Sequence, residues 1–343
     1  PQVWRIFNDE EFTAVLAIVK KDEETGKTVK IEGAKFKIKN TDTGEYYGYW
    51  EWNPLPHYVD SWVTDQSGSV MTGDKLKVGN YQLEEQKSPY GYLISSEPVP
   101  FRISSHTAYE ILPDENTAVI TILQKDTSVK GQVNIEKKGE VLTKFENEKF
   151  IYEEKGLAGA KYEIVARENI LDPSGDGTIL YEKDKVADTI TTDSEGKATS
   201  KKLPLGEYYV REIKAPEGMV INNEVKDVSL QYKDQNTPII FADTSFVNQR
   251  QKVELNVIKK DADNDVGLQG AEFGLYAKEN IVNYSGDIVV NKGQLIETAT
   301  SDENGKVHFI SDLPLTEFEV KEIKAPIGYS SNGKVINVDA TYR

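Results

Sequence analysis

One stretch of sequence occurs three times, and this repeat constrains the fold more than any other feature. The copies are LKVGNYQLEEQKSPYGY (Leu76 to Tyr92), LPLGEYYVREIKAPEGM (Leu203 to Met219) and LPLTEFEVKEIKAPIGY (Leu313 to Tyr329). Each reads as a turn, then a strand that alternates apolar and polar residues, then a Pro-Gly turn. Each places a glutamate four residues before the proline, at Glu85, Glu212 and Glu322. Copies of one unit at this spacing predict three tandem domains.

Length and composition fit three small β domains. We place them at residues 1–126, 127–248 and 249–343, each near the usual domain size of about 100–150 residues. Aromatic and β-branched residues are plentiful, and Gly and Pro interrupt them at short intervals, which favours an all-β class with many short strands.

The charge and the sulfur content restrict the partners and the compartment. A net charge of −16 repels phosphate backbones and anionic lipid, so nucleic acid and membrane are poor candidates as partners. The sequence has no cysteine, which suggests an exported protein that is stabilised without disulfides. It shows no signal peptide or sorting tail and begins within strand-like residues. We therefore expect the export signal and the anchor to lie outside this stretch.

The first strand of each unit ends an apolar row with a lysine. The period-two rule puts Leu16 and Ile18 on the same face as Lys20. In the second unit Val133 and Ile135 likewise precede Lys137, and in the third an apolar row from Val253 precedes Lys259. A lysine on a buried face is costly unless it is neutralised or paired. The neighbouring lysines Lys21, Lys138 and Lys260 should point outward.

Further motifs recur between these lysines and the glutamates. A Gly-Ala step follows the first strand, at residues 33–34, 159–160 and 270–271, and a turn TDQSG, TDSEG or SDENG follows it in the same order. The second unit closes on a strand ending at Asn248, eleven residues before Lys259. Asp126 lies eleven residues before Lys137, so the two junctions are alike. The short links favour a rod.

This pattern supports a reaction of the protein with itself. A buried lysine has a lowered pKa and becomes a nucleophile, and a buried glutamate has a raised pKa and can act as a neutral hydrogen-bond donor. If the first and last strands are neighbours, the amine can attack an Asn or Asp side-chain carbonyl with the carboxyl relaying protons. An isopeptide bond would remain. The alternative is an ordinary Lys–Glu salt bridge.

The motifs VNIEK, GLAGAKYEI, TDSEG, LPLGEYYVREIKAPEGM and FVN resemble CnaB-type domains, also called SpaA-like or prealbumin-like, of Gram-positive pilins and surface adhesins. The resemblance covers nearly the whole chain. It implies three tandem Ig-like or prealbumin-like sandwiches and assigns reactive trios by position: Lys137, Glu212 and Asn248 in the second unit, and Lys20, Glu85 and Asp126 in the first. There, QKD replaces the usual asparagine-bearing ending. In the third unit Lys259 and Glu322 match, but the last strand with its acceptor is missing.

All four tryptophans lie in the first unit, at Trp4, Trp50, Trp52 and Trp62. In EYYGYWEWNPLPHYVDSW, Trp50 and Trp52 share one face of a strand and two tyrosines share the other, so some rings should be exposed. Exposed rings can bind sugars or a partner protein, and the candidate contacts are Trp50, Trp52, Tyr58 and Trp62. Packing of this hairpin on the sheet or on an adjoining domain is the preferred interpretation.

The resemblance therefore implies a structural stalk segment of a Gram-positive cell-surface or pilus protein, extracellular and anchored to the wall, with other pilin subunits as partners. The alternative is an adhesin module that recognises a host glycan or protein through the aromatic hairpin. An enzyme with an external substrate is disfavoured because the sequence lacks nucleophile-elbow, Walker and dinucleotide motifs. We expect no cofactor and no metal. The run DADNDVG departs from the EF-hand pattern and reads as a hairpin turn.

Overall fold

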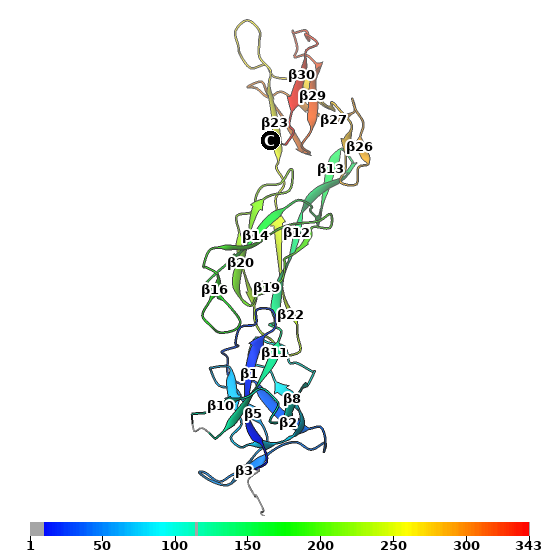
Figure 1. Ribbon diagram of the computed structural model, residues 1–343. Helices are drawn as coiled ribbons and strands as arrows, with labels where there is room; N and C mark the ends of the chain where they lie inside the picture. Colours follow the sequence, from blue (N-terminus) through cyan, green and yellow to red (C-terminus); the bar gives the residue numbers. More distant parts are fainter. Residues whose placement is uncertain (1–9, 114–115, 343) are drawn as a thin grey trace, which may run out of the picture.

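The computed structural model describes residues 10–113 and 116–342, and throughout these ranges the chain forms strands and turns without a helix. Three β-sandwiches follow one another along a rod, with the first strands at one end and the last strands at the other (Figure 1). Each sandwich has its own cluster of buried apolar side chains. The all-β class and the three tandem units agree with the prediction from the repeat. The segment before residue 10, which contains Trp4, lies outside the described residues.

The first sandwich has two facing sheets. One contains, in spatial order, β10 (Glu110–Ile111), β11 (Ala118–Asp126), β1 (Thr13–Asp22) and β6 (Ser69–Met71), with β7 (Leu76–Lys77) also paired to β1. The other contains β5 (Trp62–Val63), β2 (Lys35–Asn40), β8 (Gly79–Lys87) and β9 (Val99–Ile103). The core lies between them because alternate residues of each strand point inward.

The second sandwich repeats this plan. Its first sheet is built on β12 (Lys130–Glu146), which pairs with β13 (Lys149–Gly156), β18 (Lys197–Thr199), β19 (Leu203–Pro204) and β22 (Ile239–Asn248). Its second sheet contains β17 (Val186–Thr191), β14 (Lys161–Ala166), β20 (Gly206–Lys214) and β21 (Val225–Leu230).

The third sandwich has the same second sheet but a reduced first one. The complete sheet contains β27 (Leu295–Thr300), β24 (Glu272–Ala277), β29 (Glu317–Lys324) and β30 (Val335–Asp339). The other consists of β23 (Val253–Ile258) and β28 (Lys306–Leu313). Among the described residues no strand pairs with the other edge of β23, in agreement with the missing last strand.

The first and last strands of the two complete sandwiches run side by side and parallel. In the first, β1 pairs with β11, and Lys20 is opposite Gln124. In the second, β12 pairs with β22, and Lys137 is opposite Phe246. The acceptor residue therefore lies two positions beyond the partner of the lysine in both sandwiches. Since side chains two apart on a strand share a face, lysine and acceptor both point into the core.

A two-stranded hairpin interrupts each sandwich at the same point of its topology, between the first and second strands along the chain that belong to the second sheet. It is β3–β4 (Tyr49–Glu51 and His57–Val59) in the first sandwich, between β2 and β5. In the second it is β15–β16 (Ile170–Leu171 and Ile179–Tyr181). In the third it is β25–β26 (Ile281–Val282 and Ile288–Val290).

The core of the third sandwich is completed by residues of the second. Strand β12 runs beyond the second sandwich, and its hairpin with β13 carries Leu142 and Phe150 into the apolar cluster of the third. The connecting segment adds Arg250, which is buried, lies 3.8 Å from the ring centre of Tyr152, and pairs with Asp312. This interlocked junction stiffens the rod between the two sandwiches.

Candidate functional site

Each complete sandwich buries a cluster of one lysine, one glutamate and one acceptor between its two sheets. In the second sandwich, Lys137 lies on β12, Glu212 on β20, and Asn248 at the end of β22, and all three are buried. The repeat itself positions the lysine, because the Lys137 backbone N–H donates to the carbonyl of Gly196 in the TDSEG turn at 2.6 Å. The equivalent bonds, Lys20 to Gly68 and Lys259 to Gly305, are 2.9 and 2.7 Å.

In the second sandwich Glu212 contacts both reacting groups. Its Oε1 lies 3.0 Å from the Lys137 Nζ, and the Asn248 side-chain amide nitrogen donates to both carboxylate oxygens at 3.0 and 2.8 Å. The Asn248 Oδ1 is in close contact with the Lys137 Nζ. The carboxyl is thus placed between the amine that would attack and the nitrogen that would leave.

Burial and aromatic rings control the ionisation of this cluster. Removal from water lowers the pKa of the Lys137 amine, while the hydrogen bond and charge of Glu212 partly oppose the shift. Tyr162 covers the amine, with the Nζ 5.8 Å from the ring centre, and Phe246 packs on that ring at 4.9 Å. A buried amine of lowered pKa is a better nucleophile than an exposed one.

The first sandwich holds the equivalent cluster with a carboxylate acceptor. The Lys20 Nζ lies 2.6 Å from the Glu85 Oε1 and in close contact with the Asp126 Oδ2, and all three side chains are fully buried. Burial, reinforced by the charge of Asp126 and opposed by that of Lys20, raises the pKa of Glu85 to about 7. Burial also raises the pKa of Asp126, against the opposing effect of Lys20.

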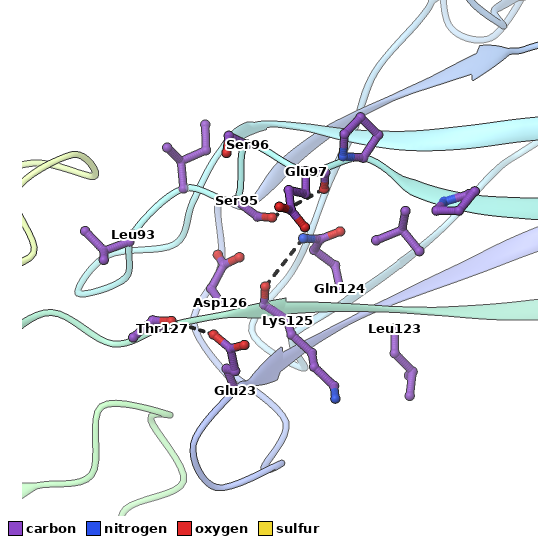
Figure 2. Close-up of a pocket in the computed structure, with 14 residues that line it drawn as sticks. Glu23, Leu93, Ser95, Ser96, Glu97, Leu123, Gln124, Lys125, Asp126 and Thr127 are labelled. Carbon is purple, nitrogen blue, oxygen red and sulfur yellow. Dashed lines mark hydrogen bonds between the residues drawn. The ribbon is translucent and has the colours of Figure 1, made fainter.

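A cleft opens beside this cluster. Figure 2 shows Asp126 at its wall, where the segment from Leu93 to Glu97 passes over the end of β11. The Ser95 backbone N–H donates to the second oxygen of Glu85 at 2.9 Å, and the Asn222 N–H does the same for Glu212 at 2.7 Å. The loop after the Pro-Gly turn therefore fixes the orientation of the glutamate in both sandwiches.

In the third sandwich Lys259 and Glu322 are brought together without an acceptor. The Lys259 Nζ lies 2.9 Å from the Glu322 Oε1 on β29, and the lysine side chain remains 18% exposed. The apolar row before it is only partly covered, since Val253 and Val257 are half-buried. Among the described residues, no Asn or Asp hydrogen-bonds or pairs with this lysine.

An aromatic ring lies opposite the glutamate of every cluster, although the sequence motifs did not mark it as part of the site. Phe36, Tyr162 and Phe273 each lie directly across the strand pair from the glutamate of their sandwich. Each is the second residue after the Gly-Ala step, so the repeat carried a signal for them. They shield the lysine and glutamate from water.

The aromatic residues of the first sandwich fall into two groups. Trp50, Trp52 and Tyr58 are exposed on the β3–β4 hairpin, where Trp50 and Tyr58 are 5.6 Å apart. Trp62 does not belong with them, because it is buried in the core and stacks on Tyr47 at 5.9 Å. The sequence grouped it with the possible ligand contacts, and this is corrected by the structure. Alternation along β5 turns the Trp62 ring inward.

The model of the SpaA prealbumin-like fold domain matches the sequence three times, at residues 14–118, 143–244 and 253–342. The chain belongs to this family. Its three sandwiches are SpaA-type domains, which confirms the resemblance inferred from the motifs. No curated protein matches the chain.

Two solved structures are similar to this chain in fold or sequence. The TIE protein of Bacillus anthracis has a TM-score of 0.61 at 22% identity, over 96% of this chain and 48% of its own. BcpA, the major pilin subunit of Bacillus cereus, has a TM-score of 0.34 at 19% identity, over 95% of each chain. The first likeness shows a shared fold, and this chain spans about half the length of the TIE protein.

The described residues contain neither a metal-binding cluster nor a helix that could span a membrane. No group of acidic and histidine side chains is arranged to hold a metal ion there. Nor does that part of the chain contain an apolar helix long enough to cross a bilayer.

Proposed function

We propose that this chain is a stalk segment of a Gram-positive cell-surface or pilus protein, stabilised by isopeptide bonds that its SpaA-type domains form within themselves. The observation that carries the proposal is the buried contact of Lys137, Glu212 and Asn248 between the first and last strands of one sandwich. Its repetition as Lys20, Glu85 and Asp126 argues against a chance salt bridge.

The chemistry in the second sandwich begins with transfer of a proton from the Lys137 ammonium to Glu212, 3.0 Å away. The neutral amine adds to the Asn248 side-chain carbonyl carbon. Glu212 then gives a proton to the amide nitrogen, 2.8 Å from its Oε2. The bond from carbon to that nitrogen breaks, and a Lys–Asn amide remains. The attacking nitrogen gives its second proton to Glu212, which passes it to the departing ammonia, so ammonium leaves and Glu212 ends as the carboxylate that it was. Its position beside the leaving nitrogen favours proton transfer over polarisation of the carbonyl.

The first sandwich follows the same path with water as the leaving group. A protonated Asp126 carboxyl is the reactive acceptor, because a carboxylate resists attack by an amine. Its raised pKa favours that form. Glu85, with a pKa of about 7, can hold or release a proton near neutrality, as a proton relay requires. Addition of the Lys20 amine and loss of one hydroxyl as water leave a Lys–Asp amide.

The position of these bonds suits a part that bears tension. Strands β1 and β11 are parallel, with Lys20 and Asp126 near their carboxyl ends. A pull on the chain enters at the start of β1, crosses the bond to Asp126, and leaves at the end of β11. The residues between the two bonded positions lie outside this path, so stretching the rod would not unravel the sandwich.

The remaining parts of the proposal follow from the same family membership and from the sequence. We assign the chain to the outside of the cell, attached to the wall, with other pilin subunits as partners. Its chemistry is a single turnover on its own side chains, so the chain is not an enzyme in the ordinary sense.

Intact mass measured on the denatured protein tests the bonds. We expect a deficit of about 35 Da, made of about 17 Da for ammonia and about 18 Da for water. Lys259 should remain a free amine that trypsin recognises. A measured mass equal to the mass calculated from the sequence would overturn the proposal.

Asp126→Asn provides a matched control for the first sandwich. The Lys–Asp and Lys–Asn products are the same amide, so the bonded variant and the bonded wild type must have identical masses, although the unreacted chains differ by about 1 Da. A variant about 1 Da lighter than the wild type would show that residue 126 is not the acceptor.

A second function, binding of a host glycan or protein, is favoured by the exposure of Trp50, Trp52 and Tyr58 on one hairpin. A glycan array probed with wild type and with the Trp50→Ala, Trp52→Ala double variant tests it. Binding by the wild type that the variant loses would support this role.

A further inference from the structure

We infer that the second sandwich completes the reactive cluster of the first, and that Gln235 is the positioning residue through which it acts. This role rests on the proposed isopeptide chemistry and concerns what holds Glu85 in place for it. The segment after the Pro-Gly turn, residues 88–95, ends at Ser95, whose backbone N–H donates to the Glu85 Oε2 at 2.9 Å. Whatever fixes this segment also fixes the carboxyl that would relay protons.

In the second sandwich the equivalent segment is tied to its own closing strand. The Asn222 N–H donates to the Glu212 Oε2 at 2.7 Å, and the Asn222 side-chain amide donates to the Val247 carbonyl on β22 at 3.1 Å. The Val220 N–H donates to the Gln249 carbonyl at 2.8 Å and secures the same segment. One asparagine therefore holds the glutamate and also ties its segment to the strand that carries the acceptor.

The first sandwich has Ser95 in the place of Asn222, since each lies ten residues after its glutamate. The shorter side chain is used locally, because its hydroxyl donates to the Glu97 carbonyl at 3.4 Å within the same segment. In the part of the chain that the structure describes, the Ser95 side chain makes no hydrogen bond to the closing strand β11. The Leu93 N–H still donates to the Thr127 carbonyl, at 3.0 Å. The segment has thus kept one tie to its own sandwich and lost the other.

The loop between β21 and β22 of the second sandwich replaces the lost tie. The Gln235 side-chain carbonyl accepts from the Ser88 N–H at 3.1 Å, and the Gln235 backbone carbonyl accepts from the Ile94 N–H at 3.0 Å. One residue therefore bonds both ends of the segment, and the second bond lies next to Ser95. Because Ser88 is buried, water competes little for the first of these bonds.

Tyr232 of the same loop adds a second contact. Its hydroxyl donates to the Tyr92 carbonyl at 3.1 Å, and its ring packs on Tyr90 with the ring centres 4.7 Å apart. The loop is itself fixed by the Asp234 carboxylate, which accepts from the Asn236 N–H at 2.8 Å. The first sandwich therefore reaches its reactive arrangement when the second is folded against it.

The rate of bond formation in the full chain tests this role. Cell-free synthesis, quenched in denaturant at intervals and analysed by mass spectrometry of tryptic peptides, follows the two bonds separately. We expect the double variant Gln235→Ala, Tyr232→Phe to slow the first bond about tenfold, since side-chain hydrogen bonds that hold the segment are lost. The bond in the second sandwich should form at the wild-type rate, which also shows that this sandwich is folded.

Ser95→Asn separates positioning from a general loss of stability. Asparagine at this position ties the segment to the acceptor strand in the second sandwich, so the substitution should give the first sandwich the same internal tie. Added to the double variant, it should restore most of the lost rate without restoring the contact between sandwiches. Asn236→Ala is the matched control, because Asn236 is exposed in the same loop and both rates should stay unchanged.

The outcomes distinguish this role from the proposed function. If the double variant forms the first bond at the wild-type rate, slows both bonds alike, or is not rescued by Ser95→Asn, the role of Gln235 is overturned and the isopeptide chemistry stands. A wild type that never forms the first bond overturns both. Hydrogen exchange at the Ser95 N–H should be faster in the double variant and slow again on rescue, and an unchanged rate of exchange would equally count against the role.

Discussion

Glu212→Ala is the most informative single change, because it removes the group that contacts both the attacking amine and the leaving nitrogen. We expect the variant to keep its full mass in the second sandwich, whereas the wild type loses about 17 Da there. The first sandwich should react normally, which supplies an internal control within the same sample.

Two effects lower the stability of Glu212→Ala: loss of the bond and burial of an unpaired lysine. The proposed bond would enclose 111 residues, and closing a loop of about 100 residues stabilises a fold by about 4.7 kcal/mol. Loss of that term lowers the melting temperature of a domain this size by on the order of 20 °C. The Ala variant also leaves Lys137 buried without its carboxylate, which costs about 3–5 kcal/mol more.

Lys137→Met separates the loss of the bond from the cost of the unpaired buried lysine. It removes the amine and so the bond, but it leaves no unpaired cation and keeps the contact of Asn248 with Glu212. Its melting temperature should therefore lie between those of wild type and Glu212→Ala in calorimetry. If Glu212→Ala still lost ammonia in the second sandwich, the proton-transfer role assigned to this carboxyl would be wrong.

Two further predictions concern the junction and the pH dependence. Arg250→Ala should destabilise the third sandwich by about 2 kcal/mol through loss of the contact with Tyr152. X-ray scattering should then show a broader distribution of rod lengths, and an unchanged distribution would remove Arg250 from the junction. Asp126→Ala blocks bonding in the first sandwich but keeps burial, which is the main cause of the raised pKa of Glu85. A carboxyl whose pKa is higher in the folded than in the unfolded chain binds more protons when folded. The free energy of unfolding therefore decreases as the pH rises from the unfolded pKa to the folded one. The melting temperature of that variant should thus fall from pH 5 to 7 more than that of the same variant with Glu85→Gln, and equal slopes would contradict the shift.

The repeat made much of each cluster predictable, because it marks functional positions by recurrence. The turn that ends at Gly196 bonds the Lys137 backbone, and the hydroxyl of Thr192 in that turn accepts from the Ala160 N–H at 3.0 Å. Both motifs were visible in the sequence: the first bond holds the strand of Lys137, and the second ties the Gly-Ala step before β14 to the same turn. The assignment of reactive roles to the clustered residues, and the domain limits at residues 126 and 248, remain predictions.

Other features could not be predicted because they depend on contacts between sandwiches or between the two facing sheets of one sandwich. Residues 139–156 alternate in polarity like any hairpin, and nothing local shows that Leu142 and Phe150 pack in the third core. Likewise Trp62 and Trp52 are equal in propensity for strands, and only the facing sheet decides which ring is buried. Sequence patterns define the faces of a strand, whereas the partner of each face is set by the assembled fold.

The hairpin shared by the second and third sandwiches bears on how such chains can be cut and recombined. A middle segment ending at residue 248 would carry Leu142 and Phe150 with nothing to cover them, so it should aggregate more readily than a segment extended through the following domain. The unit that can be exchanged between proteins is therefore a pair of domains, and grafting experiments should move the second and third domains together.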